Sequence, residues 1–351
     1  LFRKPAAGPS IRTSPFKPPV TNQPEDRFGP GEPALAGKPC SEPIKPEPDS
    51  LSATATSSAA LAALGAPSAA LYTALHSLLS QTPGGAQPLQ QLLETGKLNS
   101  RTLENLSSLT QQPRARGLDG EVLTQETLAI LSGPDRNIWQ SDRFTCGATN
   151  LERQWAENPE GFTSIVAGLS SPEGKARLIS GFTLQRAEGS LDQDGSGRTH
   201  IDRILQSSIM AAAGAGRGHY DVATDRFSND RGGGLKIAEI SAITAVSQNT
   251  PQVVIAYGSK SAQATNELFA KLQPGETFQA AMTNWEGKDH MLLVQGVHDG
   301  SIRYFDPADR AQHTLRLGDF LWKTQYLVIP QPMAGRVNFP PESIHSQAQP
   351  K

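Results

Sequence analysis

The chain has 351 residues, of which 37% are hydrophobic, enough for one large domain or two modest domains with a buried core. Its formal net charge is −2 and its isoelectric point is near 6.4, so charge gives no reason to expect nucleic acid or an anionic membrane surface as a partner. No stretch approaches the roughly 18 apolar residues of a membrane-spanning helix, and two cysteines are too few for a disulfide framework.

Residues 1–56 are rich in proline and poor in large apolar side chains, and they hold twelve of the 27 prolines. Such a segment buries too little apolar surface to fold alone, so we predict a disordered, proline-rich arm that acts as a linker. Cys40 lies in this arm and Cys146 in the globular part. We therefore expect no stabilising disulfide between them, and a reducing compartment at the site of action.

Residues 57–133 carry leucines at spacings of three, four and seven, which is typical of helices. Pro67 interrupts the first run, and Gly133-Pro134 ends the last one. The pattern predicts a small helical region. Its residues favour neither a separate bundle nor a layer packed on the domain that follows.

Residues 134–330 begin with further helices and then change period. From Glu276 onward, short apolar or alternating runs indicate strands, and Asp299-Gly300 is a strong hairpin turn signal. Helices followed by an antiparallel sheet predict the α+β class. Residues 331–351 are polar and proline-rich, and we expect a flexible tail there.

Cys146 stands just before a predicted helix, followed by the small residues Gly147 and Ala148. The N-terminus of a helix is the positive end of its dipole, which favours a thiolate. We expect Gly147 to allow a tight turn there and the small neighbours to admit a substrate backbone. A lone cysteine is more often an inert core residue, so the prediction of a nucleophile depends on its partners.

His290 opens the apolar strand that begins at Met291, a position that holds an imidazole rigidly at the edge of a cleft. Asp306 ends the next strand, across the Asp299-Gly300 turn, so antiparallel pairing centred near His298 is expected to bring the two side chains together. Asp289 is the weaker partner for the imidazole because successive strand residues face opposite sides.

Gln140 lies six residues before Cys146, in a run that also contains Trp139 and Phe144. A tetrahedral oxyanion needs positioned donors. The backbone N–H of Cys146 and the side-chain amide of Gln140 are the candidates.

The order Gln140, Cys146, His290, Asp306 resembles the papain superfamily, in its bacterial branch of bacteriocin-processing peptidases and toxin-domain proteases. The glutamine matches that superfamily's oxyanion position, and the 144-residue step from Cys146 to His290 falls in its range of about 130–150. The resemblance covers about residues 136–330 and implies a papain-like fold, with an N-terminal helical lobe followed by an antiparallel β-sheet lobe. No second cysteine or tryptophan flanks Cys146, and the orienting residue is Asp rather than Asn, so plant-type specificity is not implied.

The resemblance implies a thiol peptidase that cleaves a protein or peptide without a cofactor. It also implies a secreted or delivered bacterial effector or toxin module acting in a reducing cytoplasm, with an immunity or inhibitor protein as partner. The same residues would serve a glutamine deamidase or a transglutaminase-like acyltransferase. A non-enzymatic binding module with a structural Cys146 is a third alternative.

Metal signals are weak. Asp192, Asp194 and Ser196 match the first half of a calcium-binding EF-hand loop, but Arg203 stands where the loop's final glutamate belongs. No HExxH or CxxC motif indicates zinc. We therefore predict no metal site.

Overall fold

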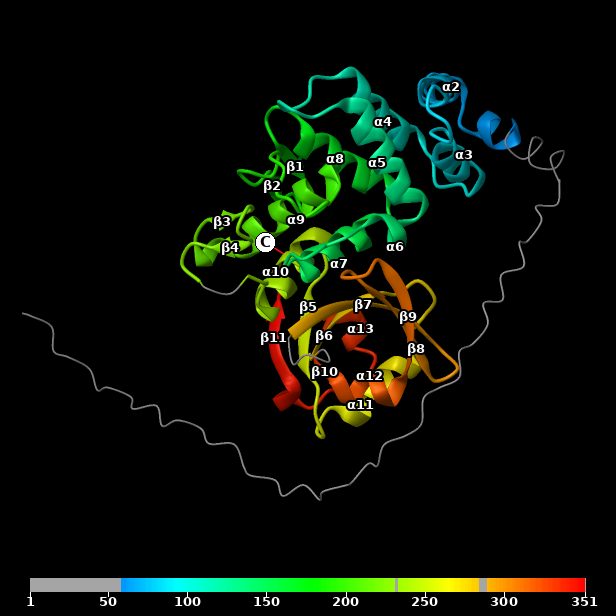
Figure 1. The fold of residues 1–351 in the computed structure, drawn as a ribbon. Coiled ribbons are helices and arrows are strands. Elements are labelled where there is room, and N and C mark those ends of the chain that lie inside the picture. Colours follow the sequence, from blue (N-terminus) through cyan, green and yellow to red (C-terminus); the bar gives the residue numbers. More distant parts are fainter. Residues whose placement is uncertain (1–57, 231–232, 284–288, 351) are drawn as a thin grey trace, which may run out of the picture. The chain divides into compact units, whose positions relative to one another are not determined.

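The computed structural model describes residues 58–230, 233–283 and 289–350. The predicted arm, residues 1–56, lies outside the described residues. Those described contain a helical part followed by an antiparallel sheet (Figure 1), which confirms the α+β class. No described helix is both long and apolar enough to cross a membrane.

The helical part is built from amphipathic segments whose ends carry recognisable caps. Asn99 and Asp119, for example, accept backbone N–H bonds at the starts of their helices. The helices are α2 (Ala66–Leu79), α3 (Gln87–Glu94), α4 (Ser100–Gln111), α5 (Gly120–Ser132), α6 (Pro134–Asn137), α7 (Cys146–Trp155), α8 (Pro159–Ser170), α9 (His200–Ala213) and α10 (Ile237–Gln248).

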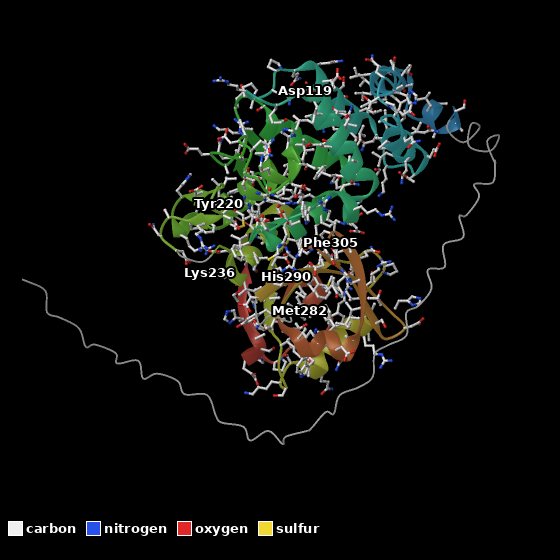
Figure 2. All side chains as sticks on the ribbon, viewed as in Figure 1. Asp119, Tyr220, Lys236, Met282, His290 and Phe305 are labelled. Atoms are coloured by element: carbon white, nitrogen blue, oxygen red, sulfur yellow. The ribbon has the colours of Figure 1, made fainter. Side chains whose placement is uncertain are left out.

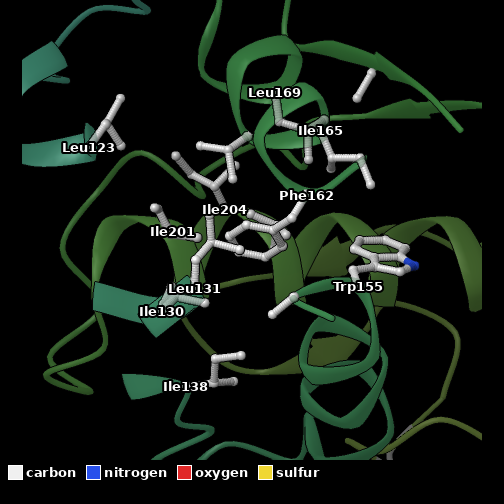
Figure 3. Close-up of a cluster of buried hydrophobic side chains, with 14 of the residues drawn as sticks. Leu123, Ile130, Leu131, Ile138, Trp155, Phe162, Ile165, Leu169, Ile201 and Ile204 are labelled. Atoms are coloured by element: carbon white, nitrogen blue, oxygen red, sulfur yellow. The ribbon is translucent and has the colours of Figure 1, made fainter. Parts of the chain in front are cut away.

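One buried cluster runs through these helices. It extends from Tyr72 to Ile243, and Figure 3 shows Leu123 and Leu131 of α5 facing Ile204 of α9. The helices of residues 57–133 therefore form a layer on the domain that follows, because they share its core. Two small hairpins and a short 3₁₀ helix fill the connections: β1 (Lys175–Arg177) with β2 (Thr183–Gln185), β3 (Tyr220–Asp221) with β4 (Arg226–Phe227), and η1 (Ala215–Arg217).

The large sheet has the strand order β11-β5-β10-β6-β7-β8-β9, and every neighbouring pair is antiparallel. Its strands are β5 (Gln252–Ala256), β6 (Phe278–Thr283), β7 (Asp289–His298), β8 (Ser301–Asp306), β9 (Ala311–Arg316), β10 (Thr324–Pro330) and β11 (Ile344–Ala348). The helices among them are α11 (Ala262–Ala270), α12 (Leu317–Lys323), α13 (Gln331–Ala334) and η2 (Pro341–Ser343).

Both faces of the sheet are covered because its central strands alternate two apolar sets. Ile255 and Leu327 point to the face covered by α11, α12 and α13, around which the strands curve in Figure 1. Val254 and Val328 point to the opposite face, where they pack against Ile240 of α10. The helical part thus meets the sheet through α10, and α7 reaches the same face at Cys146.

The prediction of a flexible tail after residue 330 is wrong for the described part of that segment. Met333 and Val337 are buried against the sheet, and β11 pairs with β5 as its edge strand. The prolines of this segment suggested a flexible chain, but Pro332 and Pro341 occupy first-turn helix positions. A proline is tolerated there because the N–H that it lacks would have no partner within the helix.

Candidate active site

Cys146 is the first residue of α7, as predicted, and its thiol is free and partly buried. Thr145 stands at the N-cap but does not cap the helix with its side chain. The first-turn N–H groups therefore keep their partial positive charge beside the sulfur. Gly147 has a different purpose from the tight turn we expected: a Cβ there would approach Ile240 Cδ1 to 2.7 Å, so glycine lets α7 and α10 pack closely.

The β7–β8 hairpin brings His290 and Asp306 together. The imidazole Nε2 lies 2.8 Å from Asp306 Oδ1. Asp299 and Gly300 have φ of 48° and 70°, the left-handed pair that a two-residue hairpin turn needs.

The register of this hairpin differs from the expected one. Leu293 pairs with Phe305, so His290 and Asp306 are diagonal neighbours on one face rather than directly opposite. The turn is centred between Asp299 and Gly300, not at His298, and the register shifts between Val294 and Gly296.

The side chain of Asp289 bonds a different partner from the imidazole of His290. Its Oδ1 accepts a hydrogen bond from Gln325 Nε2 at 3.2 Å. Among the described residues, the imidazole of His290 is thus oriented by Asp306.

The electrostatics of His290 depend on two partners. Burial alone would lower its pKa, but hydrogen bonding and electrostatic interaction with Asp306 and Cys146 raise the pKa to about 10. Burial would raise the pKa of Asp306, whereas the hydrogen bond and charge of His290 hold it below its usual range. Because Asp306 takes Nε2, the second ring nitrogen is the one left for the sulfur.

Gln140 is buried beside these groups, and the turn after β8 holds its backbone. Its N–H donates to Pro307 O at 3.1 Å, and the indole N–H of Trp139 donates to Ala308 O at 2.9 Å. One hydrogen of the Gln140 amide goes to Arg143 O at 3.1 Å. An amide nitrogen carries a second hydrogen, which can serve another acceptor.

A cavity of about 440 Å³ joins these residues. Gln140, Cys146 and His290 line it, together with apolar side chains of α10 and the sheet such as Ile240 and Tyr326. Lys236 also borders the cavity, and Figure 2 shows it beside His290 where the helices meet the sheet. All four sequence-predicted groups therefore gather at one place, since Asp306 contacts His290.

The segment between Gln140 and Cys146 is anchored by a residue that sequence reasoning missed. Asp225, buried and at φ 55°, accepts a hydrogen bond from the backbone N–H of Phe144 and another from the hydroxyl of Tyr220. Phe144 itself is 52% exposed and lines the cavity. The Asp-Arg pair at residues 225–226 gives no sign of this role in the sequence, because the contact spans more than 80 residues.

Neither metal signal in the described residues marks a site that needs an ion. Asp194, from the partial EF-hand match, is bonded to Arg198 at 2.6 Å, so its charge is already neutralised. Asp306, Asp309 and His313 place their ligand atoms within 4.8 Å of one another. His290 contacts Asp306 and His313 contacts Asp309 at 2.7 Å, so these carboxylates already have cationic partners when the rings are protonated.

Two buried carboxyl groups interact across neighbouring helices, Glu152 of α7 and Asp202 of α9. Burial raises the pKa of Asp202 to about 7 and, together with the charge of Asp202, raises that of Glu152 well above its usual range. Glu152 Oε1 has no hydrogen-bond donor among the described residues, and the charge of Asp202 acts on this carboxyl group. The raised pKa values of both groups favour a proton on the pair in the folded state.

We expect Glu152→Gln to make folding less sensitive to alkaline pH. A raised folded-state pKa contributes stability that is present at low pH and lost as pH rises through that value. The wild type should lose unfolding free energy between pH 7 and pH 9 through this proton, at no more than about 1.4 kcal/mol per pH unit. Urea titrations at the two pH values measure the loss, which the permanent amide donor of the variant should remove.

Glu104→Gln is the matched control, because Glu104 forms an exposed ion pair with Arg101. Its pH dependence should equal that of the wild type. Equal alkaline losses in wild type and Glu152→Gln would contradict a shared proton at Glu152.

No protein-family model matches the chain, and no curated protein or solved structure is significantly similar to it. The residues of this site and their geometry are therefore the basis for inferring a function.

Proposed function

We propose that the chain is a papain-like cysteine hydrolase, and specifically a thiol peptidase with a triad of Cys146, His290 and Asp306. One observation carries the proposal: an imidazole that a carboxylate hydrogen-bonds shares one cavity with a partly buried thiol at a helix N-terminus, and that thiol contributes to the raised pKa of the imidazole. The sequence order of these groups and the helix-then-sheet arrangement support the papain-like form of the site.

The inert-cysteine alternative fits the surroundings less well. A structural cysteine is normally sealed among apolar side chains, where burial favours the neutral thiol. Cys146 has apolar neighbours on one side, Ile240 among them, but its other side meets the charged pair of His290 and Asp306. A binding module needs no such pair.

The proposed reaction begins with an ion pair between the Cys146 thiolate and the His290 imidazolium. The sulfur attacks the carbonyl carbon of an amide, and the carbonyl oxygen becomes an oxyanion that the N–H of Cys146 and the Gln140 amide stabilise. The C–N bond then breaks as His290 gives its proton to the leaving amine. A water molecule, deprotonated by the now neutral imidazole, attacks the thioester, and the thiolate leaves as the imidazolium re-forms.

Asp306 keeps the imidazole in one orientation and stabilises its charged form. It is a positioning residue, because it touches the ring and not the substrate. The chain needs no cofactor for this chemistry.

Product mass tests the reaction class. Wild type and Cys146→Ala are incubated with a mixture of reduced, unfolded proteins, and the products are analysed by mass spectrometry. Peptidase action gives new termini that are absent with Cys146→Ala. Deamidation adds about 1 Da at glutamine, and acyl transfer adds the mass of a supplied amine. Either of these mass changes, without new termini, would show that the protein is a deamidase or an acyltransferase and not a peptidase.

Thiol labelling distinguishes the three enzymatic activities from a non-enzymatic binding module. Iodoacetamide should alkylate Cys146 in the folded protein faster than a free cysteine at pH 6, because the neighbouring imidazolium favours the thiolate. Labelling no faster than free cysteine, with no product in the mass analysis, would overturn the hydrolase proposal. Delivery as a bacterial effector is proposed on the sequence resemblance alone.

A further inference from the structure

The residues just before the two proposed catalytic groups are held by one buried side chain. Trp139 precedes Gln140, Thr145 precedes Cys146, and Gln206 of α9 bonds both Trp139 and Thr145. Gln206 has no exposed surface.

All four hydrogen-bonding positions of the Gln206 amide are used. Its Nε2 donates to Trp139 O at 3.1 Å and to Glu152 Oε2 at 2.8 Å. Its Oε1 accepts from Thr145 Oγ1 at 2.9 Å and from an Arg198 guanidinium nitrogen at 2.9 Å. A flipped amide would set its oxygen against the Trp139 carbonyl and its NH₂ group against the arginine, so only one orientation satisfies the site.

Two side chains on one face of α9 hydrogen-bond the backbone N–H and C=O of Trp139. Asp202 accepts its N–H at 3.4 Å, and Gln206, four residues further along α9, donates to its carbonyl. A capping box between Thr199 and Asp202 fixes the start of α9. The segment that carries Gln140 is thus attached to a rigid helix.

Thr145 supplies the other half of the connection. Its hydroxyl donates to Gln206 instead of capping α7, so the residue before Cys146 is tied to the same amide as the residue before Gln140. Without this link, the segment that contains Gln140 and the segment that contains Cys146 are connected directly only by the chain between residues 141 and 144.

We infer that Gln206 is the positioning residue of the proposed oxyanion hole: through Trp139 and Thr145 it sets the distance between the Gln140 amide and the Cys146 sulfur. The inference rests on the proposed function. Preorganised donors stabilise an oxyanion only when their geometry is fixed in advance, and a shift of about 1 Å can cost about a hundredfold in rate.

Two reactions of the sulfur separate this role from simple stabilisation of the fold. Alkylation by iodoacetamide forms a C–S bond with loss of iodide and generates no oxyanion. Acylation by p-nitrophenyl acetate forms a C–S bond through a tetrahedral oxyanion, and the bond between the acyl carbon and the phenolic oxygen breaks to release p-nitrophenolate. Loss of a positioned donor should slow only the second reaction.

Thr145→Val removes the hydroxyl at constant shape, and Thr145→Ser restores it. We expect acylation to fall about tenfold or more in Thr145→Val, alkylation to stay within twofold of wild type, and Thr145→Ser to acylate like wild type. Gln206→Glu is a second variant, since it keeps the acceptor for Thr145 and loses the donor to Trp139. It should show the same selective loss.

A double-mutant cycle with Gln140→Ala shows whether the effect passes through Gln140. Once that amide is gone, Thr145→Val should slow acylation by less than a further twofold. An independent, multiplying effect would overturn the inference, as would equal losses of alkylation and acylation in both variants. If wild type acylates no faster than free cysteine, the proposed function fails and this inference with it, whereas a fast wild type that Thr145→Val leaves unchanged refutes the inference alone.

Discussion

His290→Gln should lower turnover by about 10²–10⁴, the range that a positioned general acid or base contributes. The ring contacts Asp306 and interacts with Cys146, and its side chain is 17% exposed, so it is placed to exchange a proton with a substrate bound at the sulfur. Alkylation by iodoacetamide at pH 6 should fall as well, because the sulfur loses the cation that favours its anionic form. Single-turnover acylation and alkylation rates measure both effects.

His298→Gln is the matched control for this substitution. His298 also contacts an aspartate, Asp299, at 3.0 Å, but it lies at the exposed end of β7 and does not line the cavity. Its substitution should leave both rates within twofold of wild type. Normal turnover in His290→Gln would show that the imidazole takes no part, and the triad would have to be abandoned.

Asp306→Asn should move the alkaline limit of activity to lower pH. Proton delivery to the leaving amine requires charged His290, so wild-type kcat/KM should fall as pH rises through its pKa of about 10. Asparagine keeps a hydrogen-bonding oxygen but removes the negative charge, and a lost opposite charge lowers a histidine pKa by about 1–3 units. A pH–rate profile from pH 6 to 11 measures the shift.

The pH dependence of the unfolding free energy should also shift to lower pH in Asp306→Asn. A raised histidine pKa stabilises the folded state fully below the unfolded value of about 6.5, and this contribution disappears as pH rises through about 10. In Asp306→Asn the contribution should be smaller and should vanish at lower pH.

Asp289→Asn provides the comparison, because Asp289 adjoins His290 in sequence yet bonds Gln325. Its alkaline limit should coincide with that of wild type. A larger shift in Asp289→Asn than in Asp306→Asn would mean that the wrong carboxylate has been assigned to the imidazole.

The parts of the site that follow from local rules could be predicted from the sequence. A cysteine before a helix, and a histidine and an aspartate across an Asp-Gly turn, are related by short-range geometry. Even so, the predicted register of the β7–β8 pair differs from the observed one. The pairing shifts between Val294 and Gly296, and the sequence gives no clear sign of that shift.

Other parts depend on contacts between distant segments. Gln206 and Glu152 read as ordinary polar residues on helices, and only the packing of α9 against α7 turns them into a buried network. The C-terminal strand was missed for a similar reason. Its alternation is weak, and β5 supplies the pairing that makes it a strand.

The bonds from Trp139 and Gln140 to the turn at Pro307-Ala308 have a consequence for control of the site. Arg310 stacks on the Trp139 ring at 3.8 Å and reinforces the same junction. One junction thus holds both the proposed oxyanion donor and the strand end that orients the imidazole, so opening it would disturb two parts of the proposed site at once. If the proposal holds, a ligand that separates Trp139 from Arg310 would inhibit the protein without contacting the sulfur.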